Sequence, residues 1–187
     1  MEFSILTEKE YRDFFENCTQ ASFMQSIELS HLKEDYQDKV HLIGIKKNNK
    51  IVAGTMLLES SSTLNKKMFY APRGLMVDYN DYELLSFFTI KLKEYIKRLG
   101  GFILTIDPNV IYRVRSSNGD IIPNNKSNDV AISNLKKLGY NHYGFNVYLD
   151  AKQARWAYRM PLDEDYETKK SKFSKSTRKN IESCMEL

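Results

Sequence analysis

The chain of 187 residues is long enough for one domain, or for one domain and part of a second. It is 42% hydrophobic and 12% aromatic, which supports a sizeable core and excludes a wholly disordered chain. The formal net charge of +4 is too small by itself to indicate a nucleic-acid-binding protein. No apolar stretch is long enough to cross a bilayer, and the N-terminus lacks a signal-peptide pattern. We therefore expect a cytoplasmic globular protein, with a peripheral membrane role left open.

The first two predicted elements are helices. Thr7 and Glu10 have the spacing of a capping box, which predicts a helix that runs to about Asn17. A second, shorter helix is expected to begin near Ser26.

Strands follow these helices. Residues 40–45 and 51–58 are rich in β-branched and aliphatic side chains, and the Lys-Asn-Asn-Lys sequence at 47–50 predicts a hairpin turn between them. Residues 66–72 predict a third strand.

A long helix and a short strand come next. Apolar residues recur at helical spacing over residues 82–99, with Asn80 or Asp81 as the N-cap and Gly100 just beyond the end. The apolar residues 102–107 then predict a short strand that is buried on both faces.

The remaining sequence continues the alternation. A polar loop is expected over residues 109–128, a helix over 129–139, strands over 140–150 and 155–162, and a basic helical segment from Glu164 onward. The order of elements predicts an α/β fold with a mixed sheet flanked by helices.

Motifs for nucleophilic, nucleotide or metal chemistry are missing from the sequence. It contains no P-loop, GxGxxG, GxSxG, HExxH or paired CxxC pattern. The histidines at 31, 41 and 142 are scattered, and Cys18 and Cys184 lie far apart without metal-ligand spacing. We expect no metal site and two reduced, structural thiols.

Two strand ends carry residues suited to an anionic or amine ligand. After Tyr70, the Arg73-Gly74 pair offers a planar guanidinium and a close backbone approach, although a surface turn explains it equally well. Asp107 follows an apolar strand, where ligands of open α/β sheets bind, although a turn-capping aspartate is the plain alternative.

Charged residues of two helices form further candidates. Leu29, Lys33 and Tyr36 share one helix face, so Lys33 is a candidate for a diphosphate and Tyr36 for ring stacking. Lysine packing over the edge of the core is the simpler interpretation. The run KKSKFSKSTRK at residues 169–179 has six cations and no acid, which fits a solvated helix face or a contact with an anionic partner.

The same places carry a resemblance to a known family. The stretches MEFSILTEKEYRDF, MQSIELSHLK, KMFYAPRGLMVDYNDYELLSFF, FILTIDP and FSKSTRKNIE resemble the first half of the FemABX-type aminoacyltransferases, especially the MurM-like members. These enzymes build the interpeptide bridge of peptidoglycan. The combination of Tyr-x-x-Arg-Gly-x-x-x-Asp-Tyr with a later strand that ends in Asp-Pro is a fairly specific signature.

The resemblance implies a GCN5-acetyltransferase-like fold, usually present as two tandem domains. It implies transfer of an amino acid from aminoacyl-tRNA to the stem-peptide amine of UDP-MurNAc-pentapeptide or a lipid-linked precursor, with no cofactor. Such a reaction starts from an activated ester, so alignment and oxyanion stabilisation suffice without an internal nucleophile.

The resemblance also implies residue roles. Lys33 would face the diphosphate of the precursor, Tyr36 would contact the same ligand, and Asp107 would be an acidic residue near the acceptor peptide, a candidate catalytic base. Position implies a precursor-binding region lined by Tyr70, Arg73, Gly74 and Phe102. For tRNA or an anionic inner membrane face, the candidate cations are Lys175, Arg178 and Lys179.

Length is where the sequence departs from the family. Members are about twice as long, so we expect residues 1–162 to form the first domain and residues 163–187 to enter a second domain that is absent. The chain is then expected to be a fragment that is inactive alone. Two alternatives remain: a stand-alone acetyl-CoA-dependent N-acetyltransferase, disfavoured by the missing pyrophosphate loop, and a non-catalytic module that binds tRNA or a partner protein.

Overall fold

A computed structural model describes residues 1–35, 39–61, 66–116, 118–123, 127–144 and 163–185. The chain divides into two compact units, Met1–His142 and Tyr143–Leu187. The predicted boundary after residue 162 borders a stretch outside the described residues, so it stays a prediction. No helix in the described part of the chain is long and apolar enough to cross a membrane.

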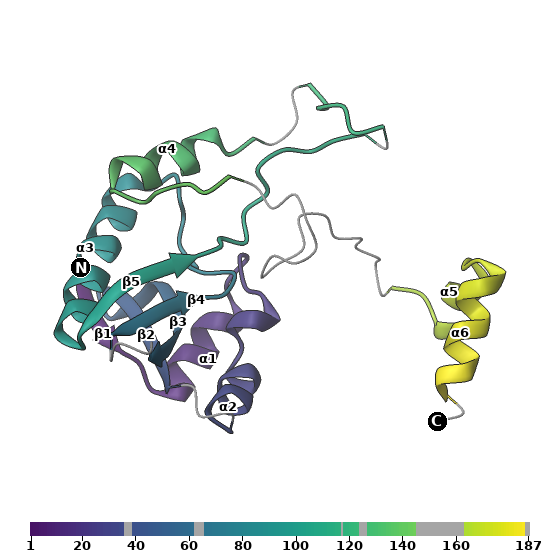
Figure 1. The fold of residues 1–187 in the computed structure, drawn as a ribbon, viewed down its shortest axis with the longest axis horizontal. Coiled ribbons are helices and arrows are strands. Elements are labelled where there is room, and N and C mark those ends of the chain that lie inside the picture. Colours follow the sequence, from purple (N-terminus) through teal and green to yellow (C-terminus); the bar gives the residue numbers. More distant parts are fainter. Residues whose placement is uncertain (36–38, 62–65, 117, 124–126, 145–162, 186–187) are drawn as a thin grey trace. The chain divides into compact units, whose positions relative to one another are not determined.

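The first unit is built on a five-stranded mixed sheet (Figure 1). Its strands lie in sequence order, with antiparallel pairing from β1 to β4 and parallel pairing between β4 and β5. The parallel pair requires a crossover, which a long helix supplies. The strands are β1 (Glu2–Ile5), β2 (Lys39–Lys47), β3 (Lys50–Ser61), β4 (Lys67–Ala71) and β5 (Gly101–Ile106).

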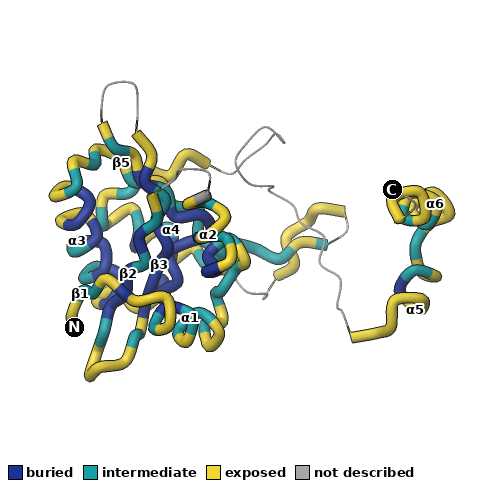
Figure 2. Tube along the Cα trace, turned by 90° about the horizontal axis from the view of Figure 1, so that it is seen from below, coloured by how far each residue is buried: buried dark blue, intermediate teal, exposed yellow. Residues whose placement is uncertain are grey.

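Helices cover both faces of this sheet. Along β3, Leu57 packs in a core cluster with helix residue Phe88, whereas its neighbour Met56 packs in a second cluster with Tyr11. Successive strand side chains point to opposite faces, so the two clusters are the two sides of one sheet. Figure 2 shows the buried central stretches of the strands. The predicted α/β fold is confirmed. The helical elements are α1 (Glu8–Glu16), the short 3-10 helix η1 (Phe23–Gln25), α2 (Ile27–Asp35), α3 (Tyr82–Arg98) and α4 (Asp129–Lys137).

Local signals place the ends of several elements as predicted. The Thr7 hydroxyl accepts from the backbone N–H of Glu10, whose carboxylate accepts in return from the N–H of Thr7 at 2.9 Å. In the hairpin turn, Asn48 and Asn49 have φ angles of 51° and 62°, the left-handed conformation that asparagine tolerates. Asp81 caps α3 through its side chain.

Two strand predictions need correction. The strand β1 was not predicted from the sequence; it has only four residues and pairs with β2 at one edge of the sheet. The prediction that β5 is buried on both faces is wrong: β5 is the last strand of the described sheet, and Phe102 and Ile103 are 56% and 41% exposed. Of the strand expected at 140–150, residues 140–144 are irregular; the rest, and the strand at 155–162, lie outside the described residues.

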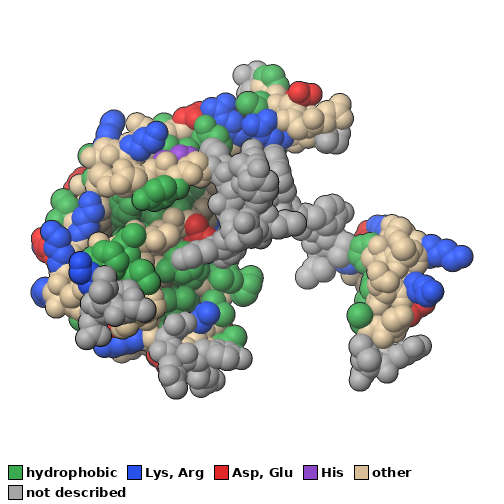
Figure 3. Space-filling view, in the orientation of Figure 1, with side chains coloured by type: hydrophobic (Ala, Val, Ile, Leu, Met, Phe, Trp, Pro, Cys, Tyr) green, Lys and Arg blue, Asp and Glu red, His purple; other side chains and the backbone are tan. Residues whose placement is uncertain are grey.

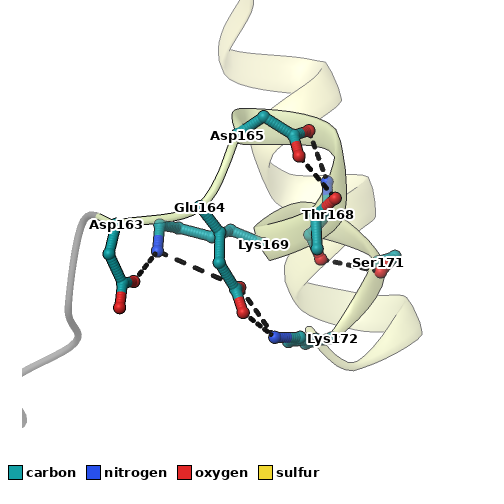
Figure 4. A network of polar contacts seen from close by, with 7 residues as sticks. All are labelled: Asp163, Glu164, Asp165, Thr168, Lys169, Ser171 and Lys172. Atoms are coloured by element: carbon teal, nitrogen blue, oxygen red, sulfur yellow. Dashed lines mark hydrogen bonds and ion pairs between the residues drawn. The ribbon is translucent and has the colours of Figure 1, made fainter.

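In the described part of the second unit, the basic segment from Glu164 onward is helical, as predicted, and forms two helices. They are α5 (Tyr166–Ser171) and α6 (Lys175–Met185). The Asp165 carboxylate caps α5 by accepting from the backbone N–H of Thr168 at 3.0 Å and from its hydroxyl at 2.6 Å (Figure 4). A capped first turn explains why so polar a sequence begins a helix here.

Candidate functional site

The turns that follow β4 and β5 meet at one edge of the sheet. These strands are parallel, and Ala71 at the end of β4 lies beside Ile106 at the end of β5. The segments that follow the two strands therefore leave the sheet at the same edge. The backbone N–H of Arg73 donates to Oδ1 of Asp107 at 2.6 Å. Two candidates predicted independently from the sequence are therefore joined at the carboxyl ends of adjacent strands, where α/β sheets bind ligands.

In the Arg-Gly pair, the left-handed backbone conformation belongs to the arginine, whereas the glycine meets a limit on space. Arg73 itself adopts the left-handed conformation, with a φ angle of 53°. Gly74 is required by space, since a Cβ atom there would lie 2.8 Å from the Thr55 hydroxyl and 3.2 Å from Nε2 of Gln25. The close backbone approach is thus an approach to the protein's own core.

The Asp107 carboxyl is electrostatically unusual. Burial raises its pKa, and the opposing influence of the Arg73 N–H and the Tyr70 side chain, which both interact with the carboxyl, does not cancel that effect. A carboxyl with a raised pKa holds a proton more readily than an ordinary aspartate. Asp107 and Tyr70 thus form a partly buried polar group that can accept a proton or bind an amine.

Two glutamines that the sequence did not indicate form hydrogen bonds with the backbone around the Arg73 turn. The Gln20 side-chain oxygen accepts from the backbone N–H of Val77 at 2.9 Å, just beyond the Arg73 turn. Gln25 is fully buried and donates to the carbonyl of Pro72 at 2.6 Å. A polar residue inside the apolar stretch "FMQSI" was the signal that could have indicated Gln25.

The predicted ligand-facing helix is only partly described. α2 carries Leu29 against the core, and Lys33, one turn later on the same face, is half-buried. Tyr36 lies outside the described residues. α2 begins two residues after Gln25, so the bond from Gln25 to Pro72 ties the start of this helix to the Arg73 turn.

Phe102 lies apart from the Arg73 and Asp107 cluster. It stands near the start of β5, five residues before Asp107, or roughly 16 Å along an extended strand. Its ring is 5.6 Å from Nζ of Lys66. Figure 3 shows hydrophobic side chains gathered on the face that carries β5, with Lys and Arg around them. Phe102 therefore contributes an exposed aromatic surface at the opposite end of the strand from the cluster.

Ion pairs divide the basic segment into two parts. Lys169 and Lys172 reach Asp163 and Glu164 at 3.1 and 2.6 Å (Figure 4), and Lys170 reaches Glu182 at 3.2 Å. These cations are neutralised within the unit. The other cations of the segment lie on α6 and share one helix face by their i, i+3 and i+4 spacing; they are Lys175, Arg178 and Lys179. Among the described residues no ion pair engages them.

A second buried polar cluster, which the sequence did not predict, joins three strands and α3. His41 contacts the Tyr95 hydroxyl through Nδ1 at 2.8 Å and the Glu59 carboxylate through Nε2 at 2.9 Å. Lys67 pairs with the other oxygen of Glu59 at 2.8 Å. Burial lowers the pKa of His41, and the bond to Glu59 opposes that shift without cancelling it.

Comparison with known proteins shows the family to which the chain belongs. A family model described as the FemAB family matches residues 6–187. The chain belongs to the FemAB family. Aminoacyltransferase FemA of Staphylococcus epidermidis is 35% identical over 151 residues, and FemA of Staphylococcus aureus is 34% identical over the same length. Each alignment covers 80% of this chain but 36% of the relative, so the chain spans about a third of these FemA proteins.

A solved structure of FemX shares the fold. It aligns with a TM-score of 0.75 and 23% identity, over 97% of this chain and 43% of FemX. The resemblance to FemABX-type aminoacyltransferases is thereby confirmed at the level of family, and the mixed sheet flanked by helices is confirmed as the fold.

Proposed function

We propose that this chain forms part of the acceptor site of an aminoacyltransferase that builds the peptidoglycan interpeptide bridge. The observation that carries the proposal is the 34–35% identity to FemA aminoacyltransferases over 80% of the chain. The donor is aminoacyl-tRNA, no cofactor takes part, and the acceptor is UDP-MurNAc-pentapeptide or its lipid-linked form. The enzyme works in the cytoplasm or at the inner face of the membrane.

The strand-end cluster supports a role in handling the acceptor amine. The amine nitrogen attacks the ester carbonyl of aminoacyl-tRNA; a C–N bond forms, the C–O bond to the ribose breaks, and the proton that leaves the nitrogen is finally carried by the released ribose hydroxyl. Asp107, whose pKa is raised by burial, is suited to receive that proton. Tyr70 interacts with the carboxyl, and the Arg73 N–H fixes its Oδ1 atom, which keeps the base oriented.

The remaining candidates are assigned to the charged parts of the substrates. Lys33 faces the diphosphate of the precursor, and Tyr36 contacts the same ligand. Further along the site, Arg73 and Gly74 shape one wall, and Phe102 provides an apolar contact. On α6, the cations without an ion pair in the described part of the chain bind tRNA, or an anionic membrane surface; they are Lys175, Arg178 and Lys179.

A transfer assay tests this function. Aminoacyl-tRNA labelled in the amino acid is incubated with UDP-MurNAc-pentapeptide and with a protein that has the full length of its FemA relatives. We expect label on the precursor with that protein and none with the 187-residue chain alone, which is proposed to be inactive by itself. Transfer of an acetyl group from acetyl-CoA, with no transfer from aminoacyl-tRNA, would overturn the proposal.

A further inference from the structure

One peptide unit, between Pro72 and Arg73, is held from both sides. Its carbonyl accepts from Nε2 of Gln25 at 2.6 Å, and its N–H donates to Oδ1 of Asp107 at 2.6 Å. In a trans peptide the C=O and N–H groups point in opposite directions. The plane of this peptide therefore lies between the Gln25 amide, on the core side, and the Asp107 carboxyl, on the strand-end side.

The orientation of the Gln25 amide is itself fixed. Its Oε1 atom accepts from the backbone N–H of Met56 at 2.7 Å, from the Tyr11 hydroxyl at 3.1 Å and from the Thr55 hydroxyl at 3.2 Å. A backbone N–H can only donate, so Oε1 must face Met56, and Nε2 must then face the Pro72 carbonyl. A rotated amide would place two donors together and two acceptors together.

Shape adds to this constraint. Gly74 leaves no room for a Cβ atom between Thr55 and Nε2 of Gln25, so the turn packs directly on the amide. Tyr11, which contacts Gln25 through its hydroxyl, is fully buried. The Gln25 amide lies in the core, and the Pro72–Arg73 peptide that it holds lies at the strand end. Movement of the turn therefore requires that hydrogen bonds of the core break.

We propose that Gln25 is a positioning residue for Asp107. Its side chain holds the Pro72–Arg73 peptide in the one orientation that aims the Arg73 N–H at Oδ1, and it thereby fixes the rotamer of the carboxyl. The importance of that rotamer for catalysis rests on the proposed function, whereas the coupling between Gln25 and Asp107 is independent of it.

Amide hydrogen exchange tests this coupling without a ligand. In the wild-type chain the Arg73 amide is protected by its bond to Asp107, and the Leu92 amide inside α3 reports on the whole fold. We expect Gln25→Met, which keeps the length of the side chain but removes its amide, to accelerate Arg73 exchange by about tenfold relative to Leu92. Tyr11→Phe is the matched control: it removes a donor to Gln25, keeps the bond to Pro72, and should leave the ratio unchanged.

Equal acceleration at Arg73 and Leu92, or none at Arg73, would overturn the proposal, because Gln25 would then act on the fold alone or not at all. Gln25→Glu gives a second readout if the methionine variant does not fold. The introduced carboxyl can donate to the Pro72 carbonyl only when protonated, so Arg73 protection should be kept at low pH and lost as the pH rises. Tyr11, whose pKa burial raises, contacts Gln25 directly, and Asp107 lies across the Pro72–Arg73 peptide; the wild type is therefore titrated in parallel.

Binding of UDP-MurNAc-pentapeptide separates this proposal from the proposed function. If the wild type binds the precursor, Gln25→Met should weaken that binding, and Tyr11→Phe should not. If the wild type does not bind it, the proposed function is in doubt, and the exchange ratio still decides whether Gln25 positions Asp107.

Discussion

Arg73 and Asp107, 34 residues apart in the sequence, are joined by a 2.6 Å hydrogen bond from a backbone N–H to a carboxylate oxygen. The bond exists because β4 and β5 are parallel neighbours that end at the same level. It makes the two strand-end turns one structure, and it sets the Asp107 carboxyl at the carboxyl ends of the strands, the edge where ligands of α/β sheets bind.

Asp107→Asn should leave the fold intact while it removes the proposed base. Asparagine can still accept from the Arg73 N–H, but it cannot take a proton. Because burial raises the folded-state pKa of Asp107, the folded protein holds this proton more tightly than the unfolded chain. The wild-type free energy of unfolding should then fall as the pH rises from the unfolded pKa through the folded one. At pH 7 the variant should be at least as stable as the wild type.

Urea unfolding at pH 3 to 7 checks that expectation. Asp13→Asn, at an exposed position on α1, is measured in parallel as the control for loss of one carboxylate charge. A marked loss of stability of Asp107→Asn at pH 7 would mean that the carboxylate charge stabilises the folded state, which would contradict a raised pKa for Asp107.

Gly74→Ala should destabilise the protein by about 1–3 kcal/mol, the usual cost of overpacking. The new methyl group would lie 2.8 Å from the Thr55 hydroxyl oxygen and must displace it or the turn. Adding Thr55→Ala removes that contact, so the double variant should be less destabilised than the sum of the two single variants. Additive effects in chemical denaturation would show that the turn does not press on Thr55.

His41 should make the protein less stable in mild acid. Burial holds the folded-state pKa of His41 below its usual value. Below about pH 6.5 the unfolded chain therefore binds a proton on His41 more readily than the folded chain does. This contribution to stability is complete above the unfolded pKa and is lost as the pH falls. His41→Gln should flatten that part of the stability curve, measured by urea unfolding between pH 5 and 7.

The exposed His31 provides the control for this titration. The hydrogen bond that the His31 ring donates to the Glu8 carboxylate raises the pKa of His31, so its contribution has the opposite sign: it is present below the unfolded pKa and is lost as the pH rises. His31→Gln should therefore leave the acid-side loss in place. An unchanged curve for His41→Gln would contradict the predicted role of His41.

Neutralisation of the α6 cations should weaken binding to RNA. A triple Gln variant at Lys175, Arg178 and Lys179 should lower the slope of log K against log salt by about 2 to 3, one unit or slightly less for each phosphate contact. The matched control is Lys170→Gln with Lys172→Gln, since these lysines already pair with Glu182 and Glu164. Filter binding with tRNA measures the slope; loss of binding to anionic vesicles instead would assign the same cations to the membrane.

Much of the fold could be predicted because its signals are local. The capping box at Thr7, the two asparagines of the hairpin turn and the helical periodicity of α3 each depend on residues a few positions apart. β1 could not be predicted, since four residues carry too little periodicity and the strand depends on pairing with β2, about 40 residues away. The exposure of β5 was missed for a similar reason, because an apolar run does not say how far other elements cover each face of a strand.

The residues of the candidate strand-end cluster could be named from the sequence, but the hydrogen bonds that join them could not. Arg73 and Asp107 stand out in the sequence because each follows an apolar strand. Their hydrogen bond depends on the parallel pairing of β4 and β5. The hydrogen bond from Gln25 to the Pro72 carbonyl joins residues 47 positions apart in the sequence. Such long-range hydrogen bonds leave no periodic trace, so a buried glutamine looks like an ordinary polar residue until the fold is known.

The proposed function is tested most directly by calorimetric titration of the protein with UDP-MurNAc-pentapeptide, with acetyl-CoA in a parallel titration. We expect heat from the precursor and none from acetyl-CoA. Lys33→Ala should weaken precursor binding by about tenfold or more, as expected for the loss of a charged hydrogen bond to the diphosphate. Lys9→Ala, at an exposed position on α1, should bind like the wild type. Binding of acetyl-CoA in place of the precursor, or equal precursor binding by Lys33→Ala and the wild type, would contradict the proposed acceptor site.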